Sequence, residues 1–148
     1  MIIRKYTPAD ASSTYALFCD TVHKVNAADY TPEQLSAWAD GLKDIGEWNT
    51  SLMANAAYVA EEGGRIVGFG DISSDGYLDR LYVAADCQRR GIATALCNIL
   101  EQPFSHIEVH ASVTAKSFFE RRGYVVISPN TVVRKGVELT NYIMVKTK

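Results

Sequence analysis

The stretch Gln88-Arg89-Arg90-Gly91-Ile92-Ala93-Thr94 joins a predicted strand, residues 77–83, to a predicted helix, residues 92–100. The helix is expected because large apolar residues recur at i, i+4, i+7 and i+8, starting from Ile92, and form one stripe. A helix N-terminus leaves backbone N–H groups without partners and carries partial positive charge. Gly91 allows a ligand to approach the backbone, and the two arginines add positive charge. The stretch therefore predicts either a phosphate-binding turn or an ordinary strand-to-helix loop.

This turn also resembles a known motif, the Q/R-x-x-G-x-G/A pyrophosphate loop of the GNAT acetyltransferases. Gln88, Gly91 and Ala93 occupy the three fixed places of that loop. The order of predicted elements resembles the same superfamily along nearly the whole chain, and in particular a bacterial subgroup of unsettled substrate. The resemblance implies an N-acetyltransferase that uses acetyl-CoA as co-substrate and an amine as acceptor.

The bulk properties exclude several other classes. The chain has 148 residues, which suits one domain over residues 1–148, and its 47% hydrophobic content is ordinary for a soluble globular protein. A net charge of -2 argues against a general nucleic-acid-binding protein. Three unpatterned cysteines and three histidines without ligand spacing indicate no disulfide framework and no metal site. Without a signal peptide or a long apolar run, we expect a cytoplasmic protein with no membrane partner.

The N-terminal part carries two helix start signals after the β-prone residues 2–6. Thr7-Pro8-Ala9-Asp10 supplies an N-cap, a first-turn proline and an acidic third residue, and it predicts a helix to about Val25. Thr31-Pro32-Glu33-Gln34 has the same chemistry and predicts a second helix that ends near Gly41. Residues 44–55 are left unassigned, apart from one more helical turn.

From residue 56 the pattern changes to strands. Residues 57–61 and 65–70 flank the Glu62-Gly63-Gly64 turn and predict a hairpin, and residues 77–83 predict the next strand. After the central helix we expect a strand at 106–110, a helix at 113–122, and a closing antiparallel pair at 124–127 and 138–145, joined by a loop that contains Pro129 and Asn130.

The resulting order, β-α-α-β-β-β-α-β-α-β-β, predicts an α/β (α+β) fold with helices on the faces of a mixed sheet. By its resemblance to the GNAT fold, we expect six to seven mostly antiparallel strands, a splayed central parallel pair and about four helices.

The resemblance implies where acetyl-CoA binds. The splayed strands would be residues 77–83 and 107–109, and the backbone at Leu81, Tyr82 and Val83 would pair with the pantetheine arm. An amide there would also polarise the thioester carbonyl. The amides from Arg89 to Thr94 would hold the pyrophosphate. Arg89 and Arg90 would reach the ribose 3′-phosphate, or else form a solvated basic turn.

Two places depart from the family pattern. Many members have an Asn at the end of the second splayed strand and a Tyr in the next helix, where the Tyr protonates the leaving sulfur. This chain has Ser112 and Phe119 there, and Phe cannot donate a proton. Either Tyr124 or Tyr142 replaces that Tyr, or CoA leaves as an unassisted thiolate. Core packing is the simpler role for Phe119.

Candidates for the general base lie on the two splayed strands. Asp79 stands in a mostly apolar run, so its carboxylate is expected to be paired, exposed or in a cleft. Strand alternation would point Arg80 to the opposite face and make it a poor partner for Asp79. His110 ends the neighbouring strand and could relay a proton, or could be an ordinary surface histidine.

The resemblance also implies that the first two helices and their loop select the acceptor. His23 near the end of the first helix is a further candidate for the site. Asp29, Tyr30 and Trp38 could form a pocket for a cationic amine, although Trp38 could equally belong to the core.

Two other classes of function remain open. A non-catalytic acyl-CoA-binding module would fit the missing Tyr at Phe119, and a protein-interaction module would use the helical N-terminal part as its interface. A homodimer is also open.

Overall fold

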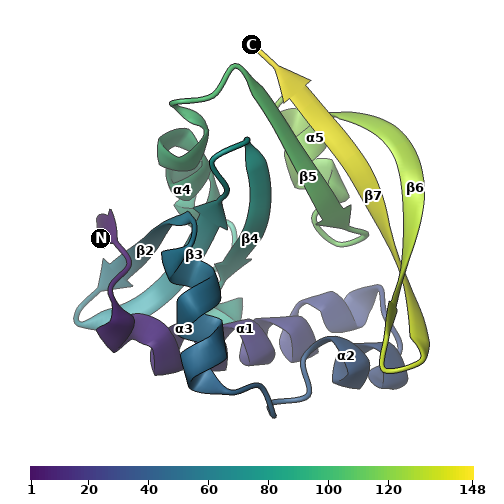
Figure 1. Cartoon of the computed structure of the whole chain (residues 1–148), viewed down its shortest axis with the longest axis horizontal. Coiled ribbons are helices and arrows are strands. Elements are labelled where there is room, and N and C mark those ends of the chain that lie inside the picture. The colour runs from purple at the N-terminus through teal and green to yellow at the C-terminus, as the bar shows by residue number, and fades with distance from the viewer.

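A seven-stranded sheet in the order β1-β2-β3-β4-β5-β7-β6 forms the frame of the chain (Figure 1). The computed structural model describes all 148 residues. Every pair of neighbouring strands is antiparallel except β4 and β5, which are parallel, and this confirms the predicted mixed sheet. The strands are β1 Ile2–Lys5, β2 Ala56–Glu62, β3 Arg65–Ile72, β4 Tyr77–Val83, β5 His106–Ser112, β6 Val125–Arg134 and β7 Val137–Thr147.

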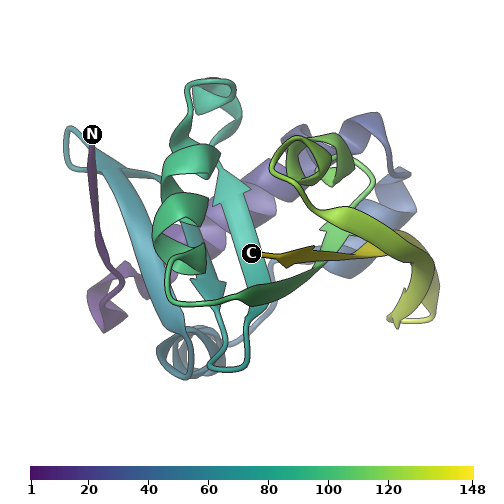
Figure 2. The same ribbon diagram turned by 90° about the horizontal axis from the view of Figure 1, so that it is seen from above.

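Five α-helices cover the two faces of the sheet, where about four were predicted. They are α1 Ala11–Lys24, α2 Pro32–Trp38, α3 Ile45–Met53, α4 Ile92–Glu101 and α5 Lys116–Arg121. Three short 3-10 turns accompany them at Pro8–Asp10, Asn26–Ala28 and Ala85–Cys87. Seen from above, α4 and α5 lie in front of the sheet, and α1 and α2 lie behind it (Figure 2).

The additional helix is α3, in the segment that the sequence left unassigned. The Asp44 carboxylate accepts the backbone N–H of Glu47 at 3.0 Å and caps the helix start. Trp48 and Leu52 are one turn apart and both are buried, so the helix has a short apolar stripe toward the core. A two-residue stripe is too short to stand out in the sequence.

The two predicted helix starts are present. The Asp10 carboxylate accepts the backbone N–H of Thr7 at 2.9 Å, although the first turn is a 3-10 turn and α1 ends at Lys24. At α2, Thr31 and Gln34 form the complete capping box. The helix predicted at 113–122 is shorter in the structure, where α5 spans Lys116–Arg121.

The closing strand pair differs from the prediction. Pro129 and Asn130 lie inside β6, opposite Tyr142 and Asn141 of β7, and the turn comes later, at Lys135 and Gly136. Because β6 is the edge strand, it has a neighbour on one side only, and a proline, which has no N–H to donate, is tolerated there.

Two glycines of β3 allow α4 to pack closely on the sheet. A Cβ atom at Gly68 would lie 3.0 Å from Cγ2 of Ile92, and one at Gly70 would lie 3.0 Å from Cδ1 of Leu100. Both α4 side chains are almost fully buried. The contact fixes the first turn of α4 next to the end of β4, where the candidate site begins.

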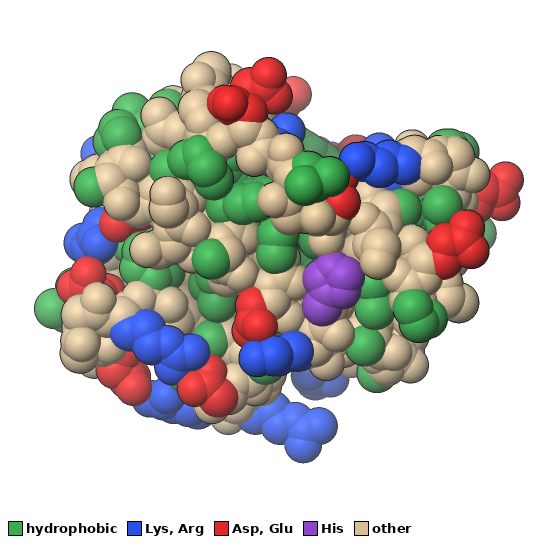
Figure 3. All heavy atoms as spheres, turned by 90° about the horizontal axis from the view of Figure 1, so that it is seen from below, with side chains coloured by type: hydrophobic (Ala, Val, Ile, Leu, Met, Phe, Trp, Pro, Cys, Tyr) green, Lys and Arg blue, Asp and Glu red, His purple; other side chains and the backbone are tan.

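On the face seen from below, acidic, basic and apolar groups alternate without a continuous patch of one charge (Figure 3). None of the helices has the length and apolar character needed to cross a membrane.

Candidate active site

The parallel strands β4 and β5 separate soon after they meet. They pair only at Tyr77 with Glu108 and at Leu78 with Val109, and then diverge, as Figure 1 shows. The backbone edge of β4 beyond Leu78 therefore has no strand partner on the β5 side. A cavity of about 710 Å³ lies along this edge and reaches α4 and α5. A second cavity, of about 680 Å³, lies between β4, α2 and the β6–β7 hairpin.

Six residues line both cavities and mark the place where they meet: Trp38, Asp79, Arg80, Tyr82, His110 and Ser112. Four of these were predicted from the sequence on the splayed strands, namely Asp79, Tyr82, His110 and Ser112, and Trp38 was predicted on the acceptor side. A molecule in one cavity can therefore reach a molecule in the other at this junction.

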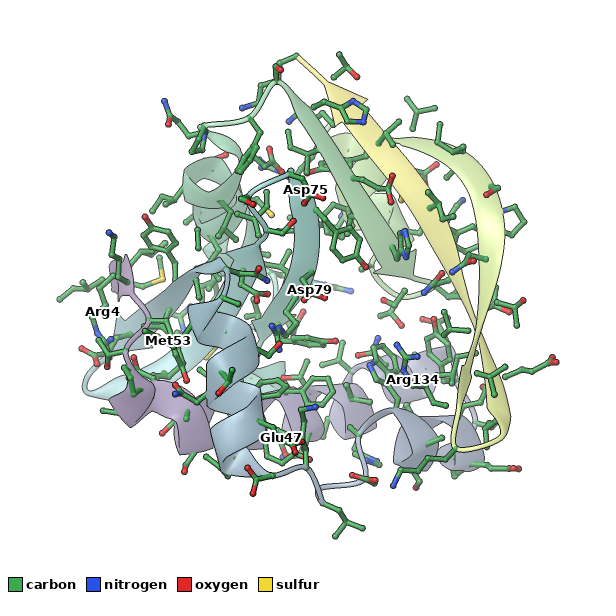
Figure 4. The ribbon with its side chains drawn as sticks, in the orientation of Figure 1. Arg4, Glu47, Met53, Asp75, Asp79 and Arg134 are labelled. Atoms are coloured by element: carbon green, nitrogen blue, oxygen red, sulfur yellow. The ribbon has the colours of Figure 1, made fainter.

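A β-bulge places Asp79 at the junction. On β3, Asp71 and Ile72 are adjacent, but their partners on β4 are Arg80 and Leu78, so Asp79 is the extra residue. Its side chain is 40% exposed. In Figure 4, Asp79 lies on β4 at one side of the space between the two parts of the sheet, and Arg134 of β6 lies at the other side.

The bulge also corrects the prediction for Arg80. Strand alternation would have directed Arg80 away from Asp79, but Nη2 of Arg80 lies 3.5 Å from Oδ2 of Asp79. The same Nη2 donates to Oδ2 of Asp71 at 2.6 Å and to Oγ of Ser51 at 2.9 Å. The extra residue breaks the two-residue alternation, so neighbouring side chains of β4 can meet.

The turn before α4 has the geometry of an anion-binding turn. Arg89 and Gly91 both have positive φ, of 63° and 81°. A Cβ atom at Gly91 would meet nothing within 4 Å, so the space beside it is open. The first hydrogen bond of α4 runs from the N–H of Ala95 to the C=O of Gly91 at 3.0 Å, and the amides of the preceding turn have no intrahelical acceptor.

Nearly all the residues predicted to bind acetyl-CoA line the larger cavity. They are Leu81, Tyr82, Val83, Gln88, Arg89, Gly91, Ile92, Ala93, Thr94, Ser112 and Phe119. Arg90 does not, because its Nη2 donates to Oε2 of Glu62 at 2.6 Å on the outer side of the turn. This hydrogen bond raises the pKa of Arg90. Arg89 has no such partner.

Gln88 and Ser112 have mainly structural contacts. Nε2 of Gln88 donates to the carbonyl oxygens of Val83 at 2.7 Å and of Ala84 at 3.3 Å, so it ties the turn back to β4. Oγ of Ser112 accepts the backbone N–H of Ala115 at 3.1 Å and Nδ2 of Asn26 at 3.4 Å.

The structure does not place Tyr124 where a general acid is needed. It lines neither cavity, is only 3% exposed, and donates its O–H to Oε2 of Glu101 at 2.8 Å. Burial and this carboxylate raise its pKa. Phe119 packs edge-on against Tyr124 at 5.1 Å and so belongs to the core as well as to the cavity wall. Tyr142, the other predicted substitute, also lies outside both cavities.

The predicted acceptor residues separate into two groups. Tyr30 and Trp38 line the smaller cavity and contact each other edge-to-face at 5.4 Å. The O–H of Tyr30 donates to the carbonyl of Thr140 at 2.7 Å, which braces the wall. His23 lies outside both cavities and hydrogen-bonds the carbonyl of Ala39 at 2.7 Å. Asp29 is also outside and accepts the Thr114 hydroxyl at 2.8 Å, so it cannot contribute to a pocket for a cation.

His110 is held by a carboxylate on its own strand. Its Nε2 lies 3.0 Å from Oε2 of Glu108, and its ring packs edge-on against Tyr77 at 5.1 Å. Burial, followed by the charges of Asp79 and Glu108, raises the pKa of Tyr77 to about 12. Tyr77 is therefore a neutral hydrogen-bonding group at physiological pH.

Several charged residues of the site were not predicted. Asp71 is fully buried and carries a sequence signal, because it is a carboxylate in the apolar run Ile66 to Ile72. Arg134 and Lys135 line the smaller cavity only because β6 and β7 extend farther than predicted. No local pattern indicates them.

Comparison with known proteins agrees with this geometry. A family model described as an acetyltransferase (GNAT) domain matches residues 26–146. An uncharacterized N-acetyltransferase of Escherichia coli (strain K12), YafP, is 37% identical over 143 residues, covering 96% of this chain and 93% of that protein. A GCN5-related N-acetyltransferase structure from Rhodopseudomonas palustris is 34% identical, with a TM-score of 0.94 over 99% of this chain and 95% of that one. The PaiA N-acetyltransferase of Thermoplasma acidophilum, solved with coenzyme A, shares the fold at 15% identity, with a TM-score of 0.79 over 99% and 98% of the two chains.

Proposed function

This chain belongs to the GNAT acetyltransferase family, and from that premise we propose that it transfers the acetyl group of acetyl-CoA to a primary amine. The acceptor is a small molecule or a peptide, and the transfer is direct, within a ternary complex. One observation carries the proposal: two cavities meet at the splayed ends of β4 and β5, and one of them leads to an open, left-handed glycine turn at a helix N-terminus.

Acetyl-CoA would occupy the larger cavity. The unpaired edge of β4 around Leu81 to Val83 offers backbone groups to the pantetheine amides. The free amides of Ile92, Ala93 and Thr94 face the pyrophosphate at the positive end of α4. Arg89 is the cation of the turn that is free to contact a phosphate, since Arg90 is paired with Glu62.

The acceptor amine would enter through the smaller cavity and meet the thioester at the junction. The amine nitrogen forms a bond to the acetyl carbon, and the carbon–sulfur bond breaks. The nitrogen gives up a proton as it attacks, and Asp79 accepts that proton directly or through water. His110, held by Glu108, lies at the same junction and can pass the proton to solvent.

The leaving sulfur has two routes. Tyr82 is the tyrosine that lines both cavities, and burial raises its pKa, so it is protonated and can donate to the sulfur. Otherwise CoA leaves as a thiolate, which is acceptable because a thiol pKa is about 8.5.

Phe119 supports a second candidate function, a non-catalytic acyl-CoA-binding module, because it stands where many family members have a proton-donating Tyr and Phe cannot donate a proton.

The test is to incubate the protein with acetyl-CoA and a panel of amines, to measure free thiol, and to find acetylated product by mass spectrometry. Amine-dependent release of CoA together with an acetylated amine supports the transferase. Acetyl-CoA binding without product from any amine would favour the binding module. Failure to bind acetyl-CoA would contradict both.

A further inference from the structure

Some charged side chains that line the smaller cavity have a partner of opposite charge, and others have none. Six charged side chains line it: Asp40, Lys43, Asp79, Arg80, Arg134 and Lys135. Arg80 is neutralised by the buried Asp71, and Lys135 pairs with Asp40. Arg134 and Lys43 have no carboxylate partner in the chain. The wall therefore keeps an excess of positive charge on the side away from β4.

The negative charge of this cavity is at its other end. Asp79 has one partner within ion-pair distance, Arg80 at 3.5 Å, and that guanidinium is already held at 2.6 Å by Asp71. Asp79 and Arg134 lie on opposite sides of the space between β4 and β6 (Figure 4). The positive charge of Arg134 also opposes the rise in the pKa of Tyr77, so its field reaches the base of β4. The cavity thus has a negative end at the junction and a positive end at the hairpin.

The hairpin that carries Arg134 is braced against α2. Lys135 pairs with Asp40, and Nε2 of Gln34 donates to the carbonyl of Glu138 at 3.0 Å. Arg134 is the last residue of β6 and pairs with Val137 across the turn. Its backbone is therefore fixed before any ligand arrives, which lowers the entropic cost of binding.

We propose that the acceptor is an amine that also carries a carboxylate, with its amino group beside Asp79 and its carboxylate on the guanidinium of Arg134. This inference rests on the acetyl transfer proposed above and adds the substrate class. The planar guanidinium can donate two parallel hydrogen bonds to a carboxylate. Seven aromatic side chains also line this cavity, including Tyr15, Trp38 and Tyr77, and they suit a substrate with an apolar body.

The test compares matched amines in the CoA-release assay. The panel contains straight-chain ω-amino acids from glycine to 6-aminohexanoate and aromatic α-amino acids. Each is paired with its carboxamide and with the amine that lacks the carboxyl group, and aminoalkyl phosphates form a separate arm. The best carboxylate substrate should exceed its neutral partner in kcat/KM by about tenfold or more, as for a hydrogen-bonded charge pair.

Arg134→Gln should remove that preference, mainly through KM, so that each carboxylate substrate falls to the kcat/KM of its neutral partner. Arg134→Lys should keep part of the preference for carboxylates, because lysine retains the positive charge but cannot donate two parallel hydrogen bonds from a planar group. Lys5→Gln, on an exposed part of β1, controls for the loss of one positive charge. Equal activity on carboxylates and neutral partners, or a preference that survives in Arg134→Gln, would overturn the inference and leave acetyl transfer intact. A preference for the phosphate arm would also overturn it. No CoA release with any amine would instead refute the proposed function.

Discussion

Nη2 of Arg80 lies 2.6 Å from the fully buried carboxylate of Asp71 and 3.5 Å from that of Asp79. The first contact crosses from β4 to β3 beside the bulge, and the second holds the carboxylate at the junction of the two cavities. The guanidinium also lies 5.1 Å from the centre of the Trp48 ring. A buried ion pair thereby links the sheet interior to the orientation of the proposed base.

Asp71→Asn should lower the free energy of unfolding by about 3–5 kcal/mol, because it leaves a buried guanidinium without its main counter-ion. Urea unfolding at neutral pH measures this change. Asp75→Asn, at an exposed turn, is the matched control and should change little. A decrease of less than about 1 kcal/mol in the free energy of unfolding would show that Arg80 does not need Asp71 as its counter-ion.

Asp79→Asn should lower kcat by about 100-fold, since the attacking amine then lacks its proton acceptor. The affinity for acetyl-CoA should not change, because the amide keeps the size of the carboxylate. Initial-rate kinetics and calorimetry check the two parts separately. An unchanged kcat would show that Asp79 is not the base, and His110 with its partner Glu108 would then be the candidate.

Tyr82→Phe distinguishes the two routes for the leaving sulfur. The ring should keep its contacts with Phe18 and Phe69, at centroid distances of 5.0 Å and 5.7 Å, so the fold is preserved. If the phenol protonates the sulfur, kcat should fall by at least about tenfold. If kcat stays within a factor of two or so, CoA leaves as a thiolate.

Glu101 should make folding stability depend on pH. Burial alone would raise its pKa, but hydrogen bonds from Arg122, Tyr124 and Lys146 and the charge of Arg122 outweigh burial, and the pKa is lowered. Its stabilising effect is therefore complete above the unfolded value of about 4.3 and is lost as the pH falls below it.

Glu101→Gln should accordingly cost about 2 kcal/mol at pH 7, and the difference from the wild type should shrink as the pH falls from 5 to 3. Urea unfolding at a series of pH values provides the measurement. A cost that is the same at every pH would show that the charge of Glu101 is not what stabilises this cluster.

The order of strands and helices could be predicted from the sequence because local signals define each element. The caps at Thr7 and Thr31 and the apolar stripe of α4 each act within a few residues. The left-handed turn before α4 was predictable for the same reason, since Gly91 and the helix start are neighbours. These features needed no knowledge of distant contacts.

The acceptor side of the site depends on long-range register and could not be predicted in this way. The bulge at Asp79 appears only when β3 and β4 are paired, and it reverses the expected direction of Arg80. Arg134 reaches the cavity because β6 continues through Pro129 as an edge strand. The hydrogen bond that removes Tyr124 as the acid joins it to Glu101, 23 positions away, and has no local signal in the sequence.

The most direct test of the central claim is a calorimetric titration of acetyl-CoA into the wild type, Gly91→Glu and Gly91→Ala. A Cβ atom at Gly91 would meet nothing within 4 Å, so a substitution there changes mainly the space open to a ligand. The alanine variant controls for strain at positive φ. We expect micromolar binding to the wild type, weaker binding to Gly91→Ala, and none to Gly91→Glu, whose charge repels the pyrophosphate. Equal binding by a folded Gly91→Glu protein, or no binding by the wild type, would contradict the acetyl-CoA site at the start of α4.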